Sequence, residues 1–306
     1  LVRGLANRYS GFQQVIAMPM GILYLASVLE RDLPGVDIRI VDIAKSVREY
    51  NTDPNRTELD LEQFTSMVLA QQVPEDFVPD FVGISILFST AHKTSMHIAA
   101  SLKNRWANAP IVVGGMHATN AVAELLESPD IDYVCRGEAE SIITQFATAV
   151  IQGGDIEAIP GIIDRSQLAR GAGQESAPLI YDLDTIPFPA WHLLNMQEYI
   201  HDESNRARRI DEISQDGEAT IITTRGCPFH CTFCASWTVH GREMRYRSTE
   251  NVVEELTQLK ERFNISTVIP EDDLFTVKKP RILDLCEAVT QKFGGTLFFE
   301  FPNGLS

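Results

Sequence analysis

Three cysteines lie within eight residues of one another, and no other stretch of the chain is as suggestive of chemistry. Cys227, Cys231 and Cys234 are separated by four and three residues. Thiolates at such spacings can converge on a single inorganic core, as they do in iron–sulfur proteins. A cubane cluster with only three protein ligands keeps one iron open for an external donor, much as catalytic zinc sites keep an open position. The spacing favours such a cluster.

A structural zinc site is the main alternative for the three cysteines. It needs a fourth ligand, which His230 or His240 could supply. Disulfides are disfavoured because the chain holds five cysteines, an odd number, and three of them are crowded together. This usage of cysteine indicates a reducing cytoplasm. The other two, Cys135 and Cys286, are interpreted as small core residues.

Alternating strands and helices are predicted around the cysteines. The β-branched run 219–224 predicts a strand that leads directly into the cysteine segment, and Thr249 is the predicted N-cap of the following helix. Further strands are expected at 266–269 and 296–301, with a helix at 280–293 between them. Parallel barrels place their chemistry at the carboxyl ends of such strands. We therefore expect the beginning of a TIM-like parallel β/α barrel that is cut short. Because the first residue is not Met, we also expect the chain to be a fragment.

The N-terminal half alternates between strand and helix periods in the same way. Strands are predicted at 36–41, 81–87, 111–113 and 131–135, with helices between them, including one at 119–127. Short connections of this kind indicate a doubly wound, flavodoxin- or Rossmann-like parallel sheet, whose first strand we expect upstream of Leu1. Ligands of such sheets bind at the carboxyl ends of the strands. The candidate residues there are Ser85, Gly114, Gly115, Gly137 and Glu138.

Composition sets the domain boundaries and excludes several partners. Glycines, prolines and charges interrupt any period over 152–217, so we expect a domain at 1–151, a linker at 152–217 and the barrel part at 218–306. The formal net charge of −16 makes nucleic acid a poor partner. No run approaches the ~18 apolar residues of a membrane span. No secretory signal is visible, which agrees with a cytoplasmic location.

The cysteine motif, with the aromatic Phe233 just before its last cysteine, resembles the signature of the radical S-adenosylmethionine enzymes. Four upstream segments resemble the cobalamin-binding domain found in one subfamily of them. These are 19–26, 82–85, 113–119 and 134–140. The resemblance covers nearly the whole chain.

The resemblance implies a [4Fe-4S] cluster on the three cysteines, with S-adenosylmethionine chelated to its open iron. One electron from the cluster would cleave S-adenosylmethionine to a 5′-deoxyadenosyl radical that abstracts a substrate hydrogen. Phe233 would lie near the adenine, and Asp272 and Asp273 would face the amino or ribose groups of the cofactor. Arg247 could pair with its carboxylate, although a surface arginine is the simpler interpretation. An electron donor such as flavodoxin or ferredoxin, and a small-molecule or peptide substrate, would complete the system.

The resemblance leaves the reaction and the cobalamin open. The D-x-H-x-x-G motif that supplies an axial histidine to cobalamin is absent, and His117 is interpreted as a polar loop residue rather than a ligand. Methyl transfer and oxidative cyclisation are both compatible with the motifs. The alternatives are a transfer-RNA methylthiotransferase, which the net charge and the few N-terminal cysteines disfavour, and a binding module stabilised by zinc or an electron-transfer cluster.

Overall fold

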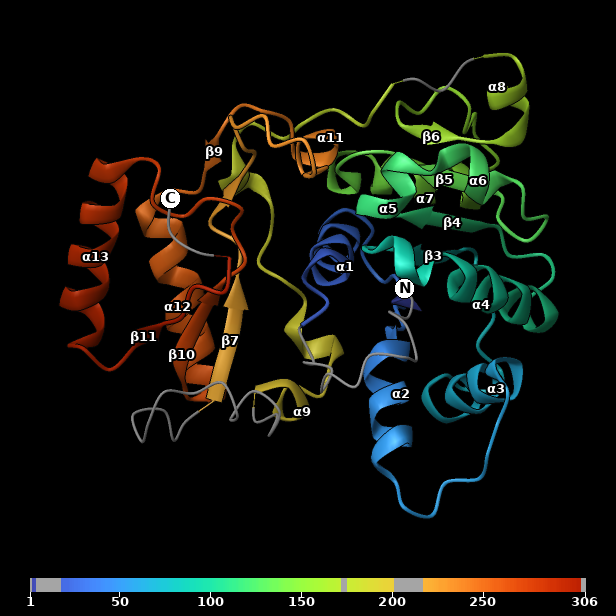
Figure 1. Cartoon of the computed structure of the whole chain (residues 1–306), viewed down its shortest axis with the longest axis horizontal. Coiled ribbons are helices and arrows are strands. Elements are labelled where there is room, and N and C mark those ends of the chain that lie inside the picture. Colours follow the sequence, from blue (N-terminus) through green and yellow to red (C-terminus); the bar gives the residue numbers. More distant parts are fainter. Residues whose placement is uncertain (1, 4–17, 172–174, 201–216, 304–306) are drawn as a thin grey trace. The chain divides into compact units, whose positions relative to one another are not determined.

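The computed structural model describes residues 2–3, 18–171, 175–200 and 217–303 (Figure 1). The chain divides into two compact units. The first consists mainly of Gly21–Leu179, joined by the strand at Val2–Arg3, and the second mainly of Ile180–Ser306. The basic residues at 206–209 and the charged stretch around them lie outside the described residues.

A six-stranded sheet forms the centre of the first unit. Its strands are β1 (Val2–Arg3), β2 (Val41–Asp42), β3 (Val82–Ser85), β4 (Ile111–Gly114), β5 (Tyr133–Cys135) and β6 (Ile162–Ile163). Their order is β2-β1-β3-β4-β5-β6, and all neighbours are parallel except β5 and β6. This is the flavodoxin-like order, with a switch point between β1 and β3. The predicted fold class is confirmed.

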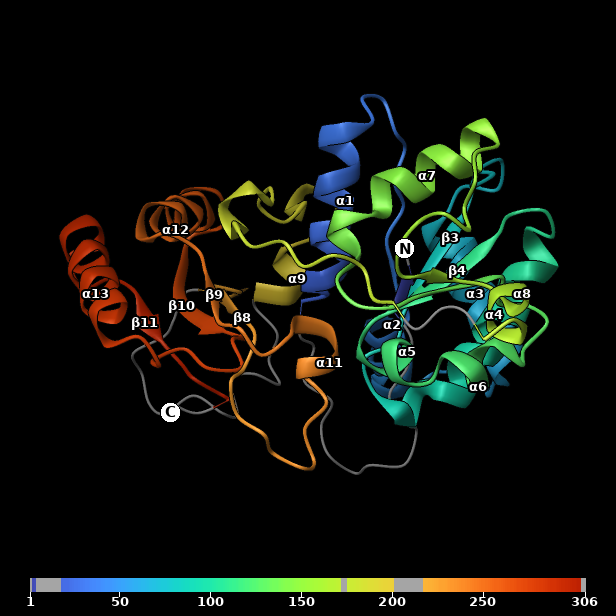
Figure 2. The same cartoon turned by 90° about the horizontal axis from the view of Figure 1, so that it is seen from above.

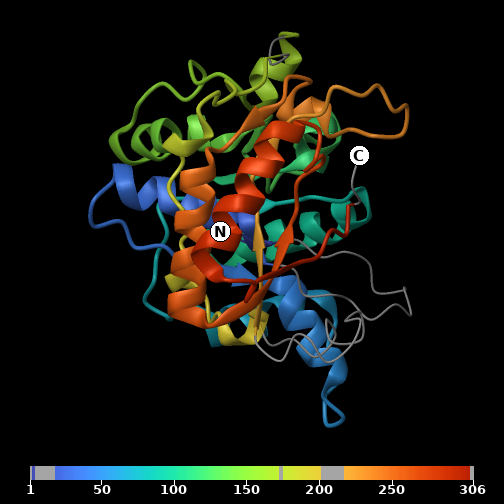
Figure 3. The same cartoon turned by 90° about the vertical axis from the view of Figure 1, so that its left-hand side faces the viewer.

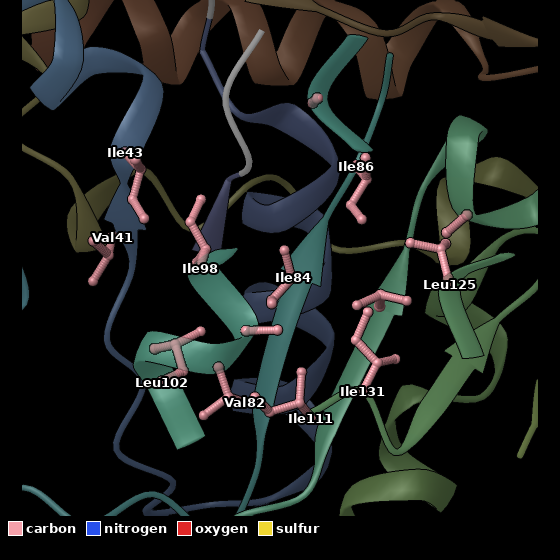
Figure 4. Packing of buried hydrophobic residues seen from close by; sticks show 14 of the residues in the cluster. Val41, Ile43, Val82, Ile84, Ile86, Ile98, Leu102, Ile111, Leu125 and Ile131 are labelled. Carbon is pink, nitrogen blue, oxygen red and sulfur yellow. The ribbon is translucent and has the colours of Figure 1, made fainter. Parts of the chain in front are cut away.

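Helices cover both faces of this sheet (Figure 2). They are α1 (Met20–Asp32), α2 (Ile43–Thr52), α3 (Leu61–Gln72), α4 (His92–Arg105), α5 (Met116–Asn120), α6 (Val122–Leu126), α7 (Ile143–Gln152) and α8 (Arg165–Ala169). Ile98 and Leu102 of α4 lie against Val82 and Ile84 of β3 in the core (Figure 4). Each aliphatic side chain buried in this way contributes about 1.5–3 kcal/mol.

Three sequence predictions for this unit were wrong in detail. The first strand is not upstream of the chain, because Val2–Arg3 is β1 and pairs with both β2 and β3. Residues 36–40 alternate in exposure but are not part of a strand, since β2 lies at the sheet edge and pairs only through Val41–Asp42. The helix expected at 119–127 is two short helices that meet at Ala121.

The second unit contains a three-stranded parallel sheet. Its strands are β7 (Gly217–Ile221), β10 (Ile265–Pro270) and β11 (Phe298–Phe299), in the order β11-β10-β7. The helices α12 (Thr249–Phe263) and α13 (Lys279–Phe293) follow β7 and β10 and pack side by side on one face of the sheet (Figure 3). The cap of α12 is Ser248 rather than Thr249. The repeated strand–helix unit confirms the predicted partial parallel barrel.

Short elements occupy the stretch that was predicted to be a linker. Within its described residues, β6 pairs with β5 in the first unit, while α9 (Gln197–Ile200) packs against β7 in the second. No helix in the described ranges has the length and apolar character needed to cross a membrane.

Candidate metal and cofactor site

The cysteine segment is a long loop closed at its base by two short strands. It leaves the sheet after β7, and β8 (Thr224–Arg225) pairs antiparallel with β9 (Arg245–Tyr246) on the far side of the loop. The Cys227 N–H also donates to the Gly241 carbonyl at 3.3 Å. Both ends of the loop are therefore fixed to each other, at the carboxyl end of the first strand of the partial barrel.

Gly226 allows the two sides of the loop base to approach closely. Its φ is +95°, and a Cβ added there would lie 2.1 Å from the Glu243 carbonyl oxygen. A side chain at this position would meet backbone that cannot move aside cheaply. The glycine immediately before Cys227 is thus required by the geometry of the loop.

The tip of the loop is exposed while its base is buried. Residues 228–233 are all exposed, whereas Gly226 and Ser236 are buried. Cys231 is exposed, Cys227 and Cys234 are partly exposed, and all three thiols are free. The loop turns back between the last two, where the Cys234 N–H donates to the Cys231 carbonyl at 3.2 Å. The thiols are accessible to an external group.

The donor set suits an iron–sulfur cluster. Three thiols are free on one accessible loop, and thiolates are the ligands that such clusters take. Among the described residues, no group of three or more His, Cys, Asp or Glu side chains is gathered around the position of one metal ion. A cluster distributes its thiolate ligands over separate irons, so its ligands need not meet at one point.

Exposed aromatic residues lie near the cysteines in the chain. Phe233 is 90% exposed and lies between the second and third cysteines. Trp237 begins α11 (Trp237–His240), and the Arg242 guanidinium carbon lies 4.5 Å from the centre of its indole ring. Arg242 also donates to the Phe229 carbonyl at 2.6 Å, which ties the tip of the loop to its returning arm. The position of Phe233 is compatible with its predicted contact to adenine, which stays a prediction.

Asp272 contacts the protein backbone where the cysteine loop begins. It follows β10, is only 3% exposed, and its carboxylate accepts from the backbone N–H groups of Thr223 at 2.6 Å and Thr224 at 3.0 Å. Its second oxygen accepts from the Thr223 hydroxyl. Burial raises the pKa of this carboxyl, and these hydrogen bonds oppose the rise. The predicted contact between Asp272 and a cofactor stays untested, and both its oxygens already have partners.

Asp273 contacts the other end of the same loop. Its carboxylate accepts from the hydroxyl of Ser236, two residues after Cys234. Unlike Asp272, Asp273 is exposed, so its carboxylate is also accessible from solvent. The predicted role of Asp273 in cofactor binding stays open.

Arg247 is not a surface residue, contrary to the sequence interpretation. It is 6% exposed, pairs with the buried Glu255 of α12, and donates to the Ile222 carbonyl at 2.9 Å. Its own N–H donates to the Thr223 carbonyl at 3.0 Å. The ion pair between Arg247, which precedes α12, and Glu255, which lies on it, cannot be read from local sequence. The available signal is that Glu255 falls on the apolar face of that helix, beside Leu256 and Leu259.

The candidate residues of the first unit gather at the carboxyl edge of its sheet. Ser85 of β3 pairs directly with Gly114 of β4. Gly115 has φ +100°, and a Cβ there would lie 2.8 Å from the Ile86 carbonyl oxygen. The Gly137 N–H, just after β5, donates to the Thr119 hydroxyl at 3.1 Å. Ser85, Gly114, Gly115 and Gly137 thus lie together, and Glu138 is buried beside them.

His117 is buried in a hydrogen-bonded chain and is not a free loop residue. It is 9% exposed, its Nδ1 lies 3.0 Å from the Ser89 hydroxyl, and its Nε2 lies 2.8 Å from Nδ1 of His92. Burial, and next the charge of His92, lower the pKa of His117. The two histidines are 25 residues apart, on segments that follow different strands, so no local signal could have paired them.

Family models match both units. A B12 binding domain matches residues 14–147, and the radical SAM superfamily matches residues 221–297. These ranges contain the candidate residues of the first sheet and the cysteine loop, respectively. The family resemblance inferred from the motifs is confirmed.

Two curated relatives and one solved structure resemble nearly the whole chain. An uncharacterized methyltransferase of Pyrococcus horikoshii is 30% identical over 277 residues, which are 90% of this chain and 52% of that protein. A cytidylyl-2-hydroxyethylphosphonate methyltransferase of Streptomyces wedmorensis is 28% identical over 84% of this chain and 51% of its own. The chain spans about half the length of these relatives.

The solved structure supports the fold. It is the radical S-adenosylmethionine methyltransferase TsrM of Kitasatospora setae, bound to cobalamin and a [4Fe-4S] cluster. It matches with a TM-score of 0.67 and 18% identity, over 97% of this chain and 54% of that one.

Proposed function

Because this chain joins a B12-binding domain to a radical SAM domain, we propose that it belongs to a cobalamin-dependent enzyme that cleaves S-adenosylmethionine reductively and transfers a methyl group. The observation that carries the proposal is the exposed loop with three free thiols at the carboxyl end of β7. Both curated relatives named above are methyltransferases and match 90% and 84% of this chain. Anaerobic magnesium-protoporphyrin IX monomethyl ester cyclases also match, over 59–72% of it. The longer matches favour methyl transfer, with oxidative cyclisation as the second candidate.

Each cofactor has candidate residues in this chain. Cys227, Cys231 and Cys234 would hold the [4Fe-4S] cluster, which when bound supplies the electron that cleaves S-adenosylmethionine. Phe233 would pack on the adenine from its exposed position, and Asp273 could accept from the amino or ribose groups. Gly114 and Gly115 lie at the sheet edge where cobalamin would bind. Gly115 shapes that edge because its missing side chain makes room for the Ile86 backbone, whose carbonyl oxygen would lie 2.8 Å from an added Cβ.

The partners follow from this chemistry. A one-electron donor of the flavodoxin or ferredoxin kind would reduce the cluster, and a small molecule or a peptide would accept the methyl group. Free thiols and a cluster of this type need a reducing compartment, which supports a cytoplasmic location. The charge of −16 disfavours transfer RNA as the substrate.

The test is an assay for cleavage of S-adenosylmethionine. The full-length protein is reconstituted anaerobically with iron and sulfide, and 5′-deoxyadenosine is measured by mass spectrometry after S-adenosylmethionine and a strong reductant are added. We expect product from the wild type and none from Cys231→Ala. Cys286→Ala is the matched control. The interpretation of Cys286 as a core residue was wrong, because it is an exposed free cysteine on α13.

Two results would contradict the proposal. A protein that binds zinc but no iron would support the zinc-stabilised alternative. An intact cluster without any cleavage of S-adenosylmethionine would support an electron-transfer module.

A further inference from the structure

Two adjacent carboxylates at the end of β10 bind the two ends of the cysteine loop. Asp272 accepts from Thr223 and Thr224, three or four residues before Cys227, and Asp273 accepts from Ser236, two residues after Cys234. The contacts join segments that are 37 to 49 residues apart in the chain. They occur where the loop is buried, whereas the thiols lie where it is exposed.

The entry of the loop is held by more than one group. Thr223 is fully buried, and its N–H and hydroxyl both donate to Asp272. Its carbonyl accepts from the Arg247 N–H at 3.0 Å and from the Arg281 guanidinium at 3.2 Å. The Thr224 hydroxyl in addition donates to the Leu274 carbonyl at 3.2 Å. Every polar group of Thr223, which lies between β7 and β8, therefore has a partner in a distant part of the chain.

We propose that Asp272 and Asp273 are positioning residues for the cluster, which fix the two ends of the cysteine loop and so the relative placement of its three thiols. The inference rests on the proposed function, because it assumes that these thiolates bind the cluster. It assigns Asp272 a role through the protein backbone rather than a contact with a cofactor. Hydrogen bonds to a charged acceptor are the strong ones, so one carboxylate can restrain two consecutive backbone amides.

The fixed ends matter because the exposed part of the loop has few restraints of its own. A three-thiolate site must present its sulfurs together, and a flexible loop would lose conformational entropy each time it bound a cluster. Because the ends are attached to the segment after β10, much of this conformational entropy is already lost when the chain folds, before the cluster binds. Loosening either end should therefore weaken retention of the cluster and broaden its spectroscopic signature.

The experiment uses three variants of the full-length protein. Asp272→Asn loosens the entry of the loop, Ser236→Ala removes the contact at its exit, and Asp284→Asn is the matched control. Asp284 is an exposed carboxylate on α13, away from the cysteine loop. Ser236→Ala deletes one hydroxyl, so it keeps the proposal testable if Asp272→Asn does not fold.

Two measurements are made on each variant. The first is hydrogen exchange at the backbone amides of Thr223 and Thr224 in the cluster-free protein. We expect these amides to exchange at least about tenfold faster in Asp272→Asn than in the wild type, and at the wild-type rate in Asp284→Asn. In the reconstituted protein, both Asp272→Asn and Ser236→Ala should lose iron to a chelator severalfold faster and give a broadened electron paramagnetic resonance signal after reduction.

The outcomes separate this inference from the proposed function. Unchanged exchange at Thr223 and Thr224 in Asp272→Asn would overturn the positioning role, whether or not a cluster forms. Unchanged iron loss and an unchanged signal in both variants would do the same. A wild type that binds no cluster would instead contradict the proposed function, while the exchange measurement would still decide whether Asp272 holds the loop.

Discussion

The guanidinium of Arg247 forms an ion pair with the carboxylate of Glu255 in the interior of the second unit. Glu255 has no exposed surface, and its Oε1 has no hydrogen-bond partner among the described residues. Burial raises the pKa of the Glu255 carboxyl, and the charge of Arg247 opposes that rise. Arg247 also donates to Asn251 through Nε at 2.6 Å. The pair joins the segment after the cysteine loop to helix α12.

Breaking this pair should destabilise the protein strongly. Arg247→Met would leave a buried carboxylate without its partner, and we expect a loss of about 3–5 kcal/mol in the free energy of unfolding, measured with urea. The double variant Arg247→Met/Glu255→Leu should recover most of the loss. Arg170→Met is the control, since Arg170 pairs with Glu157 at an exposed site and should cost less than about 1 kcal/mol. Equal losses at the two sites would contradict the burial argument.

The glycine before the cysteines should tolerate no side chain. Gly226→Ala would place a Cβ against the Glu243 carbonyl at 2.1 Å, in addition to the strain of a positive φ. We expect the variant to retain much less iron after reconstitution than the wild type. Gly295→Ala separates the two effects, because Gly295 has φ +78° with nothing within 4 Å of the added Cβ. Wild-type iron content in Gly226→Ala would contradict the prediction, and an equal loss of iron in both variants would show that the strain of a positive φ, rather than the clash, is the cause.

The sequence alone was sufficient to predict the order of strands and helices and the cysteine loop. The alternation of strands and helices, and the spacing of Cys227, Cys231 and Cys234, follow from residues near one another in the chain. The pattern at 36–41 misled because side-chain alternation shows which residues could face a core, whereas a strand also needs a neighbour to pair with. That neighbour, β1, has only two residues, and no period can be read from two residues.

Long-range contacts could not be predicted in the same way. The sequence placed Asp272 at the end of a parallel strand, and such ends meet at one edge of a sheet. Its hydrogen bonds to Thr223 and Thr224 depend on how β10 is placed in register with β7. The pair His92–His117 likewise arises only when distant segments pack. Arg247 and Glu255 are eight residues apart, and their pair arises only when the segment before α12 packs against that helix. Such pairs leave no periodic trace in a single sequence.

A substitution at the sheet edge of the first unit should reduce the binding of cobalamin. Gly115→Ala would place a Cβ 2.8 Å from the Ile86 carbonyl oxygen, at the edge where the cofactor is expected. We expect the cobalamin content of the purified protein to fall sharply, as measured by its visible absorbance. Gly153→Ala is the control, because Gly153 also has a positive φ but an added Cβ would meet nothing within 4 Å. Normal cobalamin content in Gly115→Ala would place the binding edge elsewhere.

His117 should make the stability of the first unit depend on pH. Its folded-state pKa is lowered below the value of about 6.5 expected for the unfolded chain. Between the two values the unfolded chain binds more protons, so stability is complete above about pH 6.5 and falls as the pH is lowered towards the folded-state pKa. Glu124, whose charge acts in the opposite direction, reduces the shift.

The measurement compares urea unfolding at about pH 7.5 and about pH 5.5. The wild type should lose more stability between them than His117→Gln, by at most about 1.4 kcal/mol per pH unit. His92→Gln should lie between the two, because His92 contributes to the shift but burial contributes more. An identical pH dependence in the wild type and His117→Gln would rule out His117 as the source.

Phe233 should affect binding of S-adenosylmethionine without affecting folding. Its side chain is 90% exposed, so Phe233→Ala removes almost no packing and should change the free energy of unfolding by less than about 0.5 kcal/mol. If the ring stacks on adenine, its loss should weaken binding about 2- to 10-fold, the equivalent of about 0.5–1.5 kcal/mol. Equilibrium dialysis of S-adenosylmethionine against the reconstituted full-length protein measures this. Phe229→Ala is the control, because Phe229 is another exposed phenylalanine of the same loop. The same affinity in both variants would remove Phe233 from the adenine site.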